Sequence, residues 1–223
     1  MTVAVKTFTI ARRREGVTHT QLVDYWRGTH AANVVAHMQP DGYTLTFFDP
    51  RDGTSGLDGM AELRYHDAAR AQGVTGRNIP AVVSGDGWAD LVELPTTWLR
   101  VTEHVIVAGP GPAAHAAATK AEREAAFKLT FLISARDGFD PEAVKRHWLD
   151  VHVPNFRQNF LASGGVRYVV NVAERATGED LVGVGELSYR DRASAQAHTV
   201  ADDGFKAMVV LRALPSREGI ITE

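Results

Sequence analysis

The sequence contains no cysteine among its 223 residues, and this absence excludes several kinds of chemistry. Disulfide bonds, thiolate nucleophiles and cysteine metal sites are all ruled out. Long apolar runs are also missing, since none approaches the roughly 20 residues that a membrane-spanning helix needs. The first residues show no basic segment followed by an apolar stretch, so we expect no signal peptide. These absences predict a cytoplasmic protein without membrane association.

An excess of charge of either sign is lacking as well. The 24 basic and 27 acidic side chains are mixed along the chain and leave a net charge of −3 at pH 7, which gives no reason to expect a nucleic-acid partner. The sequence has no phosphate-binding glycine loop, no nucleophile-elbow serine and no histidine pair at metal-ligand spacing. We therefore predict no metal, no organic cofactor and a small-molecule partner, and we leave a homodimer open.

What the sequence does contain is an internal repeat. The first copy has a Trp-x3-His pattern followed by an asparagine, and an offset of 122 residues relates Trp26, His30 and Asn33 to Trp148, His152 and Asn155. A second block, residues 59–67, recurs as residues 183–191 at an offset of 124. Two long copies indicate a duplicated domain, because solenoids contain many short ones. We predict repeat 1 over residues 1–108, a linker over 109–125 and repeat 2 over 126–223.

Each copy has the pattern strand-helix-strand-strand-helix-strand, which is the ferredoxin-like order. In the first copy we expect strands at 3–12, 43–48, 60–66 and 98–107, and helices at about 18–38, 67–73 and 86–94. In the second copy we expect strands at 127–136, 166–173, 181–189 and 218–222, with helices beginning at 140 and 191 and a helical piece over 204–214. A sheet with helices on one face leaves its other face bare. We therefore predict an α+β fold in which two fused ferredoxin-like (βαββαβ) repeats form a pseudo-dimeric α+β barrel.

The motif Tyr/His-Trp-x3-His-Ala/Val-x-Asn, placed after a strand and a Thr or Asp cap, resembles the EthD-like branch of the dimeric α+β barrel superfamily. The segment Thr102–Val107 is similar to the last strand of that family. The resemblance covers nearly the whole chain as two copies, apart from residues 109–125. It implies a pocket between sheet and helix and cofactor-independent chemistry on aromatic, polyketide-like or lactone-like molecules. Some relatives hold haem through a histidine, but nothing here marks His30 or His152 as such a ligand.

His30 and His152 are the leading catalytic candidates. An imidazole with an ordinary pKa of about 6.5 suits general acid/base work near neutral pH. We expect each histidine at the C-terminal end of the first helix of its repeat, where the helix dipole favours the charged ring. The alternative is a structural role, in which the histidine ties a helix end to a neighbouring loop.

Glu62 is the third catalytic candidate. Strand alternation places Ala61, Leu63 and Tyr65 on one face, which we expect to pack on helices. Glu62 and Arg64 then fall on the other face, as Glu186 does in the second copy. A buried carboxylate is costly without a partner, so we expect these glutamates to pair with Arg or Lys. The alternative is a solvent-facing edge position.

The remaining candidates are side chains that could contact a substrate. They are Tyr25, Trp26, Asn33, Tyr43, Arg64, His104, Trp148, Asn155, Tyr168 and Glu186. The two tryptophans could instead belong to the core, the two asparagines could cap helices, and the two tyrosines could fill the core.

The main functional prediction is a cofactor-independent lyase, isomerase or dehydratase that uses a histidine as general acid/base. Two alternatives remain, a cofactor-free monooxygenase in which the substrate anion reacts with oxygen, and a non-catalytic binding protein for a small aromatic molecule. We favour His30 over His152, because the second copy replaces Tyr25 with His147 and Arg64 with Ser188.

Overall fold

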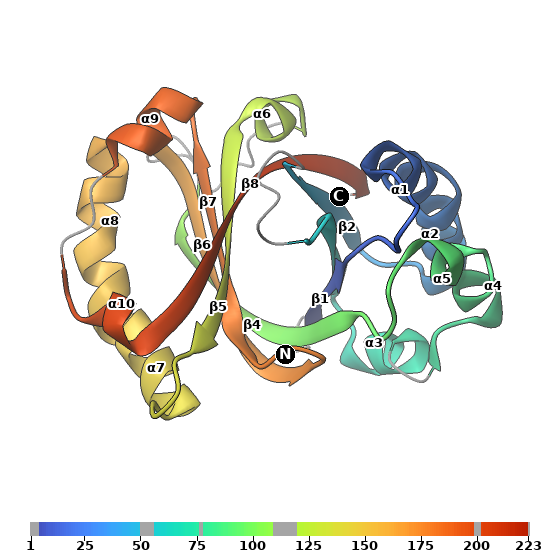
Figure 1. Cartoon of the computed structure of the whole chain (residues 1–223), viewed down its shortest axis with the longest axis horizontal. Coiled ribbons are helices and arrows are strands. Elements are labelled where there is room, and N and C mark those ends of the chain that lie inside the picture. Colours follow the sequence, from blue (N-terminus) through green and yellow to red (C-terminus); the bar gives the residue numbers. More distant parts are fainter. Residues whose placement is uncertain (1–4, 50–55, 76–77, 109–119, 199–201, 223) are drawn as a thin grey trace. The chain divides into compact units, whose positions relative to one another are not determined.

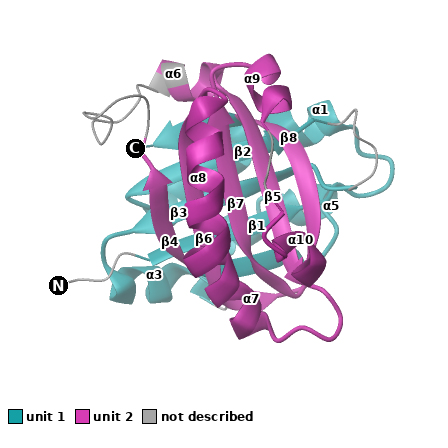
Figure 2. Cartoon of the chain, turned by 90° about the vertical axis from the view of Figure 1, so that its left-hand side faces the viewer, with its two compact units in different colours: residues 1–101, 218–223 teal, residues 102–217 magenta. Residues whose placement is uncertain are grey.

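A computed structural model describes residues 5–49, 56–75, 78–108, 120–198 and 202–222. The chain divides into two compact units, coloured separately in Figure 2. Unit 1 contains residues 1–101 and 218–223, and unit 2 contains residues 102–217. Two long strands, β4 (Thr97–Val107) and β8 (Val209–Thr222), contribute to both units. Most of the predicted linker lies outside the described residues.

In unit 1, strand β3 (Gly59–Tyr65) pairs with β1 (Val5–Ala11) and β2 (Gly42–Phe48), and β1 also pairs with the first part of β4. All three pairings are antiparallel. The helical segments are α1 (His19–Tyr25), the π-helical turn η1 (Trp26–His30), α2 (Ala31–Met38), α3 (Ala68–Val74), α4 (Ala81–Ser84) and α5 (Trp88–Leu91).

In unit 2, strand β7 (Leu181–Tyr189) pairs with β5 (Phe127–Ala135) and β6 (Gly165–Thr177), and β5 also pairs with the first part of β8. The helical segments are α6 (Lys120–Ala125), α7 (Pro141–His147), the π-helical turn η4 (Trp148–His152), α8 (Val153–Ala162), α9 (Arg192–Ala197) and α10 (Phe205–Met208). Helix α8 covers one face of the β6–β7 pair (Figures 1 and 2).

The hydrogen-bonded strand order is β1-β3-β2-β8-β5-β7-β6-β4, which is the order of a closed eight-stranded barrel. The predicted mixture of helices with an antiparallel barrel is therefore confirmed. Within the described residues, no helix combines the length and the apolar character that crossing a membrane requires.

The first helix begins where the sequence predicts, but it does not end near His30, as we expected. Thr18 and Gln21 form the expected capping box, with Thr18 N–H donating to Gln21 Oε1 at 2.8 Å. The helix then continues through η1 into α2, and Gln39 ends it in the left-handed region at φ 46°. His30 therefore lies mid-helix, and the expectation that a helix C-terminus stabilises its charged form is wrong. His152 lies mid-helix in the same way, between η4 and α8.

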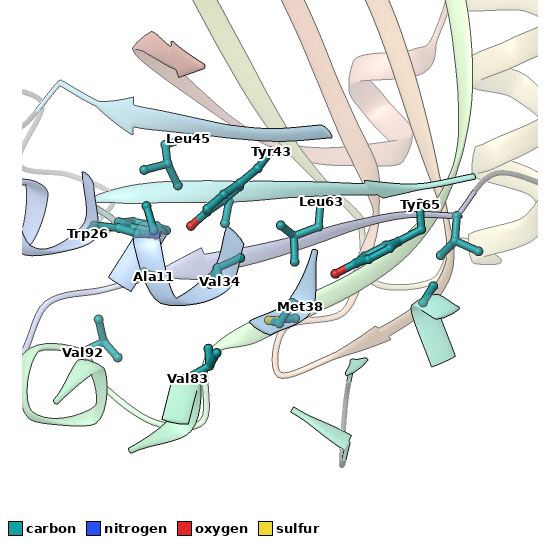
Figure 3. Packing of buried hydrophobic residues seen from close by; sticks show 14 of the residues in the cluster. Ala11, Trp26, Val34, Met38, Tyr43, Leu45, Leu63, Tyr65, Val83 and Val92 are labelled. Atoms are coloured by element: carbon teal, nitrogen blue, oxygen red, sulfur yellow. The ribbon is translucent and has the colours of Figure 1, made fainter. Parts of the chain in front are cut away.

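The core of unit 1 fills the space between the sheet and the helices. Figure 3 shows Trp26, Val34 and Met38 from the helical side packed against Tyr43 from β2 and Leu63 from β3. The predicted strand face is confirmed, since Ala61, Leu63 and Tyr65 all belong to this cluster. Unit 2 has an equivalent and more aromatic core. Its buried aromatic residues are Trp148, Phe156, Phe160, Tyr168, Tyr189 and Phe205.

The predicted helical piece over residues 204–214 is wrong beyond Met208. Only Phe205–Met208 is helical, and β8 begins at Val209. Short apolar runs such as Val209–Leu211 are ambiguous between helix and strand. Pairing decides the matter here, because β8 is in register with β5 from Val209 opposite Ala135 to Ser216 opposite Lys128.

Candidate functional site

Asp86, in the loop between α4 and α5, gathers the polar residues of the first motif. His30 Nδ1 lies 3.0 Å from Asp86 Oδ2, and Asn33 Nδ2 donates to the same oxygen at 3.0 Å. The backbone N–H of Trp88 donates to Asp86 Oδ1 at 3.0 Å. The Tyr25 hydroxyl donates to the backbone carbonyl of Asp86. The aspartate side chain is 4% exposed, so these contacts replace its water.

An aromatic stack surrounds this dyad of His30 and Asp86. The Trp88 ring lies nearly flat on the His30 ring, with centroids 4.4 Å apart and an interplanar angle of 15°. Trp88 also packs 4.7 Å from Trp26. Trp26 and His30 therefore both contact Trp88, as expected for two residues four positions apart on one helix face. Gly87 adopts φ +101°, which turns the chain so that Asp86 and Trp88 both reach the helix.

Unit 2 contains the same arrangement. His152 Nδ1 lies 2.8 Å from Asp203 Oδ2, and the N–H of Phe205 donates to Asp203 Oδ1 at 3.1 Å. The Phe205 ring stacks on His152 with centroids 4.3 Å apart. His147 Nε2 lies 3.0 Å from the backbone carbonyl of Asp203, the position that Tyr25 takes in unit 1. Between Asp203 and Phe205, Gly204 has φ +82°.

Sequence reasoning missed the two aspartates and the aromatic residues that follow them. A signal was present, because Asp-Gly-Trp at residues 86–88 and Asp-Gly-Phe at residues 203–205 are matching triplets. Their offset is 117 residues, whereas the other two blocks repeat at 122 and 124. The difference arises because the segment between β3 and Asp86 is longer than the corresponding segment of unit 2. A search at fixed offset therefore passes over these triplets.

Burial sets the protonation state of both dyads. It lowers the pKa of His30 and of His152 below 6.5, and the partner aspartate opposes this only in part. Burial alone would raise the pKa of Asp86, but hydrogen bonds from Asn33, the Trp88 N–H and His30 outweigh it, and the pKa is lowered. At neutral pH we therefore assign a neutral imidazole that donates Nδ1–H to a carboxylate. Nε2 is then the nitrogen able to accept a proton.

Four predicted substrate contacts, two tyrosines and two tryptophans, lie in the cores. Tyr43 and Tyr168 are buried between sheet and helices, and burial raises the pKa of each hydroxyl well above 10. Trp148 is buried beside Phe205, as Trp26 is beside Trp88. Asn155 is exposed and does not join Asp203 as Asn33 joins Asp86. The two copies of the asparagine therefore have different surroundings.

The glutamates lie on the sheet faces that point away from the helices. Glu62 is 3.0 Å from Lys6 Nζ and 2.6 Å from Arg64 Nε. Glu186 is 2.6 Å from Lys128 Nζ and accepts from Asn171 Nδ2 at 2.8 Å. Both carboxylates have the basic partners that we expected.

The candidate residues predicted in the first copy do not all lie around one site. Glu62 and Arg64 lie on the opposite sheet face from His30, because adjacent strand residues alternate. His104 belongs to unit 2. Within the described residues, no group of three or more histidine, aspartate or glutamate side chains is placed to hold a metal ion.

Comparison with solved structures shows that the chain shares its fold with several proteins of known structure. A candidate monooxygenase from Fusobacterium nucleatum subsp. nucleatum matches over 99% of this chain and 95% of its own, with 10% identity and a TM-score of 0.60. An anthrone oxidase-like protein matches over 99% and 94%, also with 10% identity and a TM-score of 0.60. A variant of chlorite dismutase from Candidatus Nitrospira defluvii matches over 97% and 90%, with 11% identity and a TM-score of 0.52.

No protein-family model matches the sequence, and no curated protein matches it. The structural comparisons nevertheless correct the main functional prediction. We expected a lyase, isomerase or dehydratase, whereas the similar structures are described as monooxygenases and as anthrone oxidase-like. These descriptions favour the oxidative alternative.

Proposed function

We propose that this chain is a monooxygenase-type enzyme that oxidises a small aromatic molecule carrying an acidic C–H or O–H group. The observation that carries the proposal is the buried dyad of His30 and Asp86, with Trp88 stacked on the imidazole. The dyad offers a neutral base in an aromatic setting. The descriptions of similar folds as monooxygenases and anthrone oxidase-like add support.

The first step is proton removal by Nε2 of His30. Asp86 accepts Nδ1–H and stabilises the imidazolium that forms, as the carboxylate does in a catalytic triad. A methylene group next to an aromatic ketone would give an enolate, with its charge spread over carbon and oxygen. Trp88, which is only partly buried and lies on the imidazole, supplies aromatic surface for a flat substrate.

The second step uses the electrons of the substrate anion itself. The anion reduces oxygen, the carbon–oxygen bond forms, and a hydroperoxide results. Loss of water from the hydroperoxide gives a carbonyl group, so that one methylene and one O2 become one C=O and one H2O. Because the substrate supplies all the electrons, the reaction needs no external reductant.

We propose an EthD-like chain made of two ferredoxin-like repeats, residues 1–108 and 126–223, joined by residues 109–125, with a homodimer as its assembly. Roles in substrate contact are proposed for Tyr25, Trp26, Asn33, Tyr43, Arg64, His104, Trp148, Asn155, Tyr168 and Glu186. The polar support of Asp86 by Asn33, which Asn155 does not repeat, favours His30 over His152 as the base.

Oxygen uptake with anthrone as the probe tests the proposal. We expect enzyme-dependent uptake above the uncatalysed rate, with anthraquinone as product and one O2 consumed per anthrone. His30→Ala should lower the rate about 10²–10⁴-fold, and His152→Ala should lower it less. The rate should be the same with EDTA and with added haem.

Two outcomes contradict the proposal. One is the absence of enzyme-dependent uptake with both anthrone and hydroxylated anthrones. The other is an unchanged rate in both histidine variants together with a lowered melting temperature. That second result would show that the two dyads only tie helices to loops.

A further inference from the structure

Two hydrogen-bond donors, one at the end of β3 and one on α3, are buried without acceptors among the described residues. Tyr65 is fully buried, and its hydroxyl has no hydrogen-bond partner among the described residues. The Nε atom of Arg70 on α3 is also buried and has no partner among the described residues, although 38% of the Arg70 side chain is exposed. The Arg70 guanidinium carbon lies 5.7 Å from the centre of the Tyr65 ring, so the two groups are neighbours.

Unpaired buried donors are rare in folded proteins, because each costs the free energy of removing it from water. Burial raises the pKa of Tyr65 to about 12, which keeps its hydroxyl protonated. An arginine side chain keeps its protons at any ordinary pH. Arg70 Nε can only donate, whereas the Tyr65 hydroxyl can donate and accept. The two groups are not hydrogen-bonded to each other in the structure, so the hydroxyl proton and the Nε–H both lack an acceptor among the described residues.

The charges near Arg70 indicate whether the missing acceptor is neutral or anionic. Arg70 Nη1 lies 3.3 Å from Asp41 Oδ1, which compensates the positive charge of the guanidinium. Because the charge of Arg70 is already compensated by Asp41, the site favours a neutral carbonyl oxygen over a full anion as acceptor. The Tyr65 and Arg70 donors can still stabilise negative charge that develops on that oxygen during a reaction.

The direction of the Tyr65 side chain indicates which part of unit 1 the ligand approaches. Figure 3 shows its hydroxyl directed into the apolar cluster of unit 1, toward Leu63 and Met38. Met38 follows His30 by eight residues, which corresponds to about 12 Å along a helix. The Tyr65 hydroxyl therefore points toward the part of the helix that lies about two turns beyond His30.

We propose that Tyr65 Oη and Arg70 Nε form a subsite for the carbonyl oxygen of a fused-ring aromatic ketone. This subsite rests on the proposed function, in which His30 removes a proton from the same molecule. The charge left by that proton moves onto the ketone oxygen, where the two donors stabilise it. Tyr65 and Arg70 thereby fix which end of the substrate faces the base.

Unit 2 provides an internal control. At the 124-residue offset of this block, Tyr189 matches Tyr65 and Ser194 matches Arg70. The cation is thus absent from the matching position of α9. Tyr189 packs instead on Phe160, with ring centroids 5.1 Å apart.

Binding of 9-fluorenone and of fluorene to the full-length chain tests the subsite. The two tricyclic molecules have similar shapes, but only fluorenone carries a carbonyl group. The measurement is of binding and does not depend on a reaction. We expect the wild type to bind fluorenone more tightly. Tyr65→Phe and Arg70→Met should each weaken fluorenone about 3- to 10-fold and leave fluorene unchanged. The control Tyr189→Phe should change neither.

Ligand-free stability provides a second measurement. Tyr65→Phe should not lower the melting temperature, because the hydroxyl that it removes has no partner. A lowered melting temperature, equal binding of the two tricycles by the wild type, or unchanged fluorenone binding in Tyr65→Phe would each overturn the subsite. The subsite stands without the proposed function if fluorenone selectivity is seen but oxygen uptake is not. Oxygen uptake without a preference for fluorenone over fluorene would contradict the subsite but not the proposed function.

Discussion

At the scale of single residues, the chemistry of His30 comes from neighbours that lie far away in the sequence. Its carboxylate partner Asp86 is 56 residues away, and the ring stacked on it belongs to Trp88. The sequence predicts the histidine, because a duplicated Trp-x3-His pattern is recognisable. It does not predict the dyad, because no local rule connects a helix to a loop so far along the chain.

Replacement of Asp86 by asparagine tests the role of this partner. Asp86→Asn keeps the shape but no longer stabilises an imidazolium, so turnover should fall tenfold or more while KM changes little. The matched control is Asp203→Asn, which should have a smaller effect. Steady-state oxygen uptake measures both. Full turnover in Asp86→Asn, or equal losses in the two variants, would rule out the assignment of His30 as the base.

The pH dependence of stability follows from the same burial. Folding lowers the pKa of His30 and His152 below 6.5, so the unfolded chain takes up protons first as the pH falls. The stabilising contribution is complete above pH 6.5 and is lost as the pH falls toward the lowered pKa values. Urea unfolding at pH 7.5 and 5.5 should show lower stability at pH 5.5, and His30→Gln should reduce the difference. A higher stability at pH 5.5 would contradict this assignment.

At the scale of elements, local signals predict starts and faces better than they predict ends. The Thr18 capping box and the alternation along β3 are both confirmed. The π-helical turns over Trp26–His30 and Trp148–His152 are not predictable from periodicity, because such a turn adds a residue to an otherwise regular helix. The length of β8 is not predictable either, since it depends on pairing with β5.

The two Asp-Gly-aromatic loops provide a matched pair of variants. Gly204→Ala should cost about 1–2 kcal/mol of unfolding free energy, because φ +82° is strained for alanine although nothing lies within 4 Å of the new Cβ. Gly87→Ala should cost more, since its Cβ would lie 3.1 Å from the Tyr25 hydroxyl and would displace the bond to Asp86. Urea unfolding measures both. Equal costs would show that the Tyr25 contact contributes nothing.

At the scale of the whole molecule, the repeat predicts the elements but not the division of the chain. Residues 218–223 belong to unit 1, and residues 102–107 of β4 belong to unit 2. The two ends of a long strand can pair with different strands, and a pattern within one segment does not reveal its partner. The offsets in the sequence therefore indicate duplication without showing which segments pack together.

Expression of residues 1–108 alone tests this division. The fragment lacks residues 218–222 of β8, the neighbour of β2 in the strand order, so one edge of β2 loses its partner. Exposed strand edges promote association. We expect the fragment to aggregate at concentrations where the full chain does not, and a peptide of residues 209–222 to reduce the effect. A monomeric fragment as stable as the full chain would contradict this expectation.

Oxygen labelling tests the central claim most directly. Anthrone is oxidised by the full-length protein under 18O2 in ordinary water, and the anthraquinone is analysed by mass spectrometry. We expect one 18O atom in the carbonyl group that is formed, and His30→Ala should lose most of this enzyme-dependent labelling. Product that takes its new oxygen from water, or labelling that the protein does not accelerate, would contradict the account.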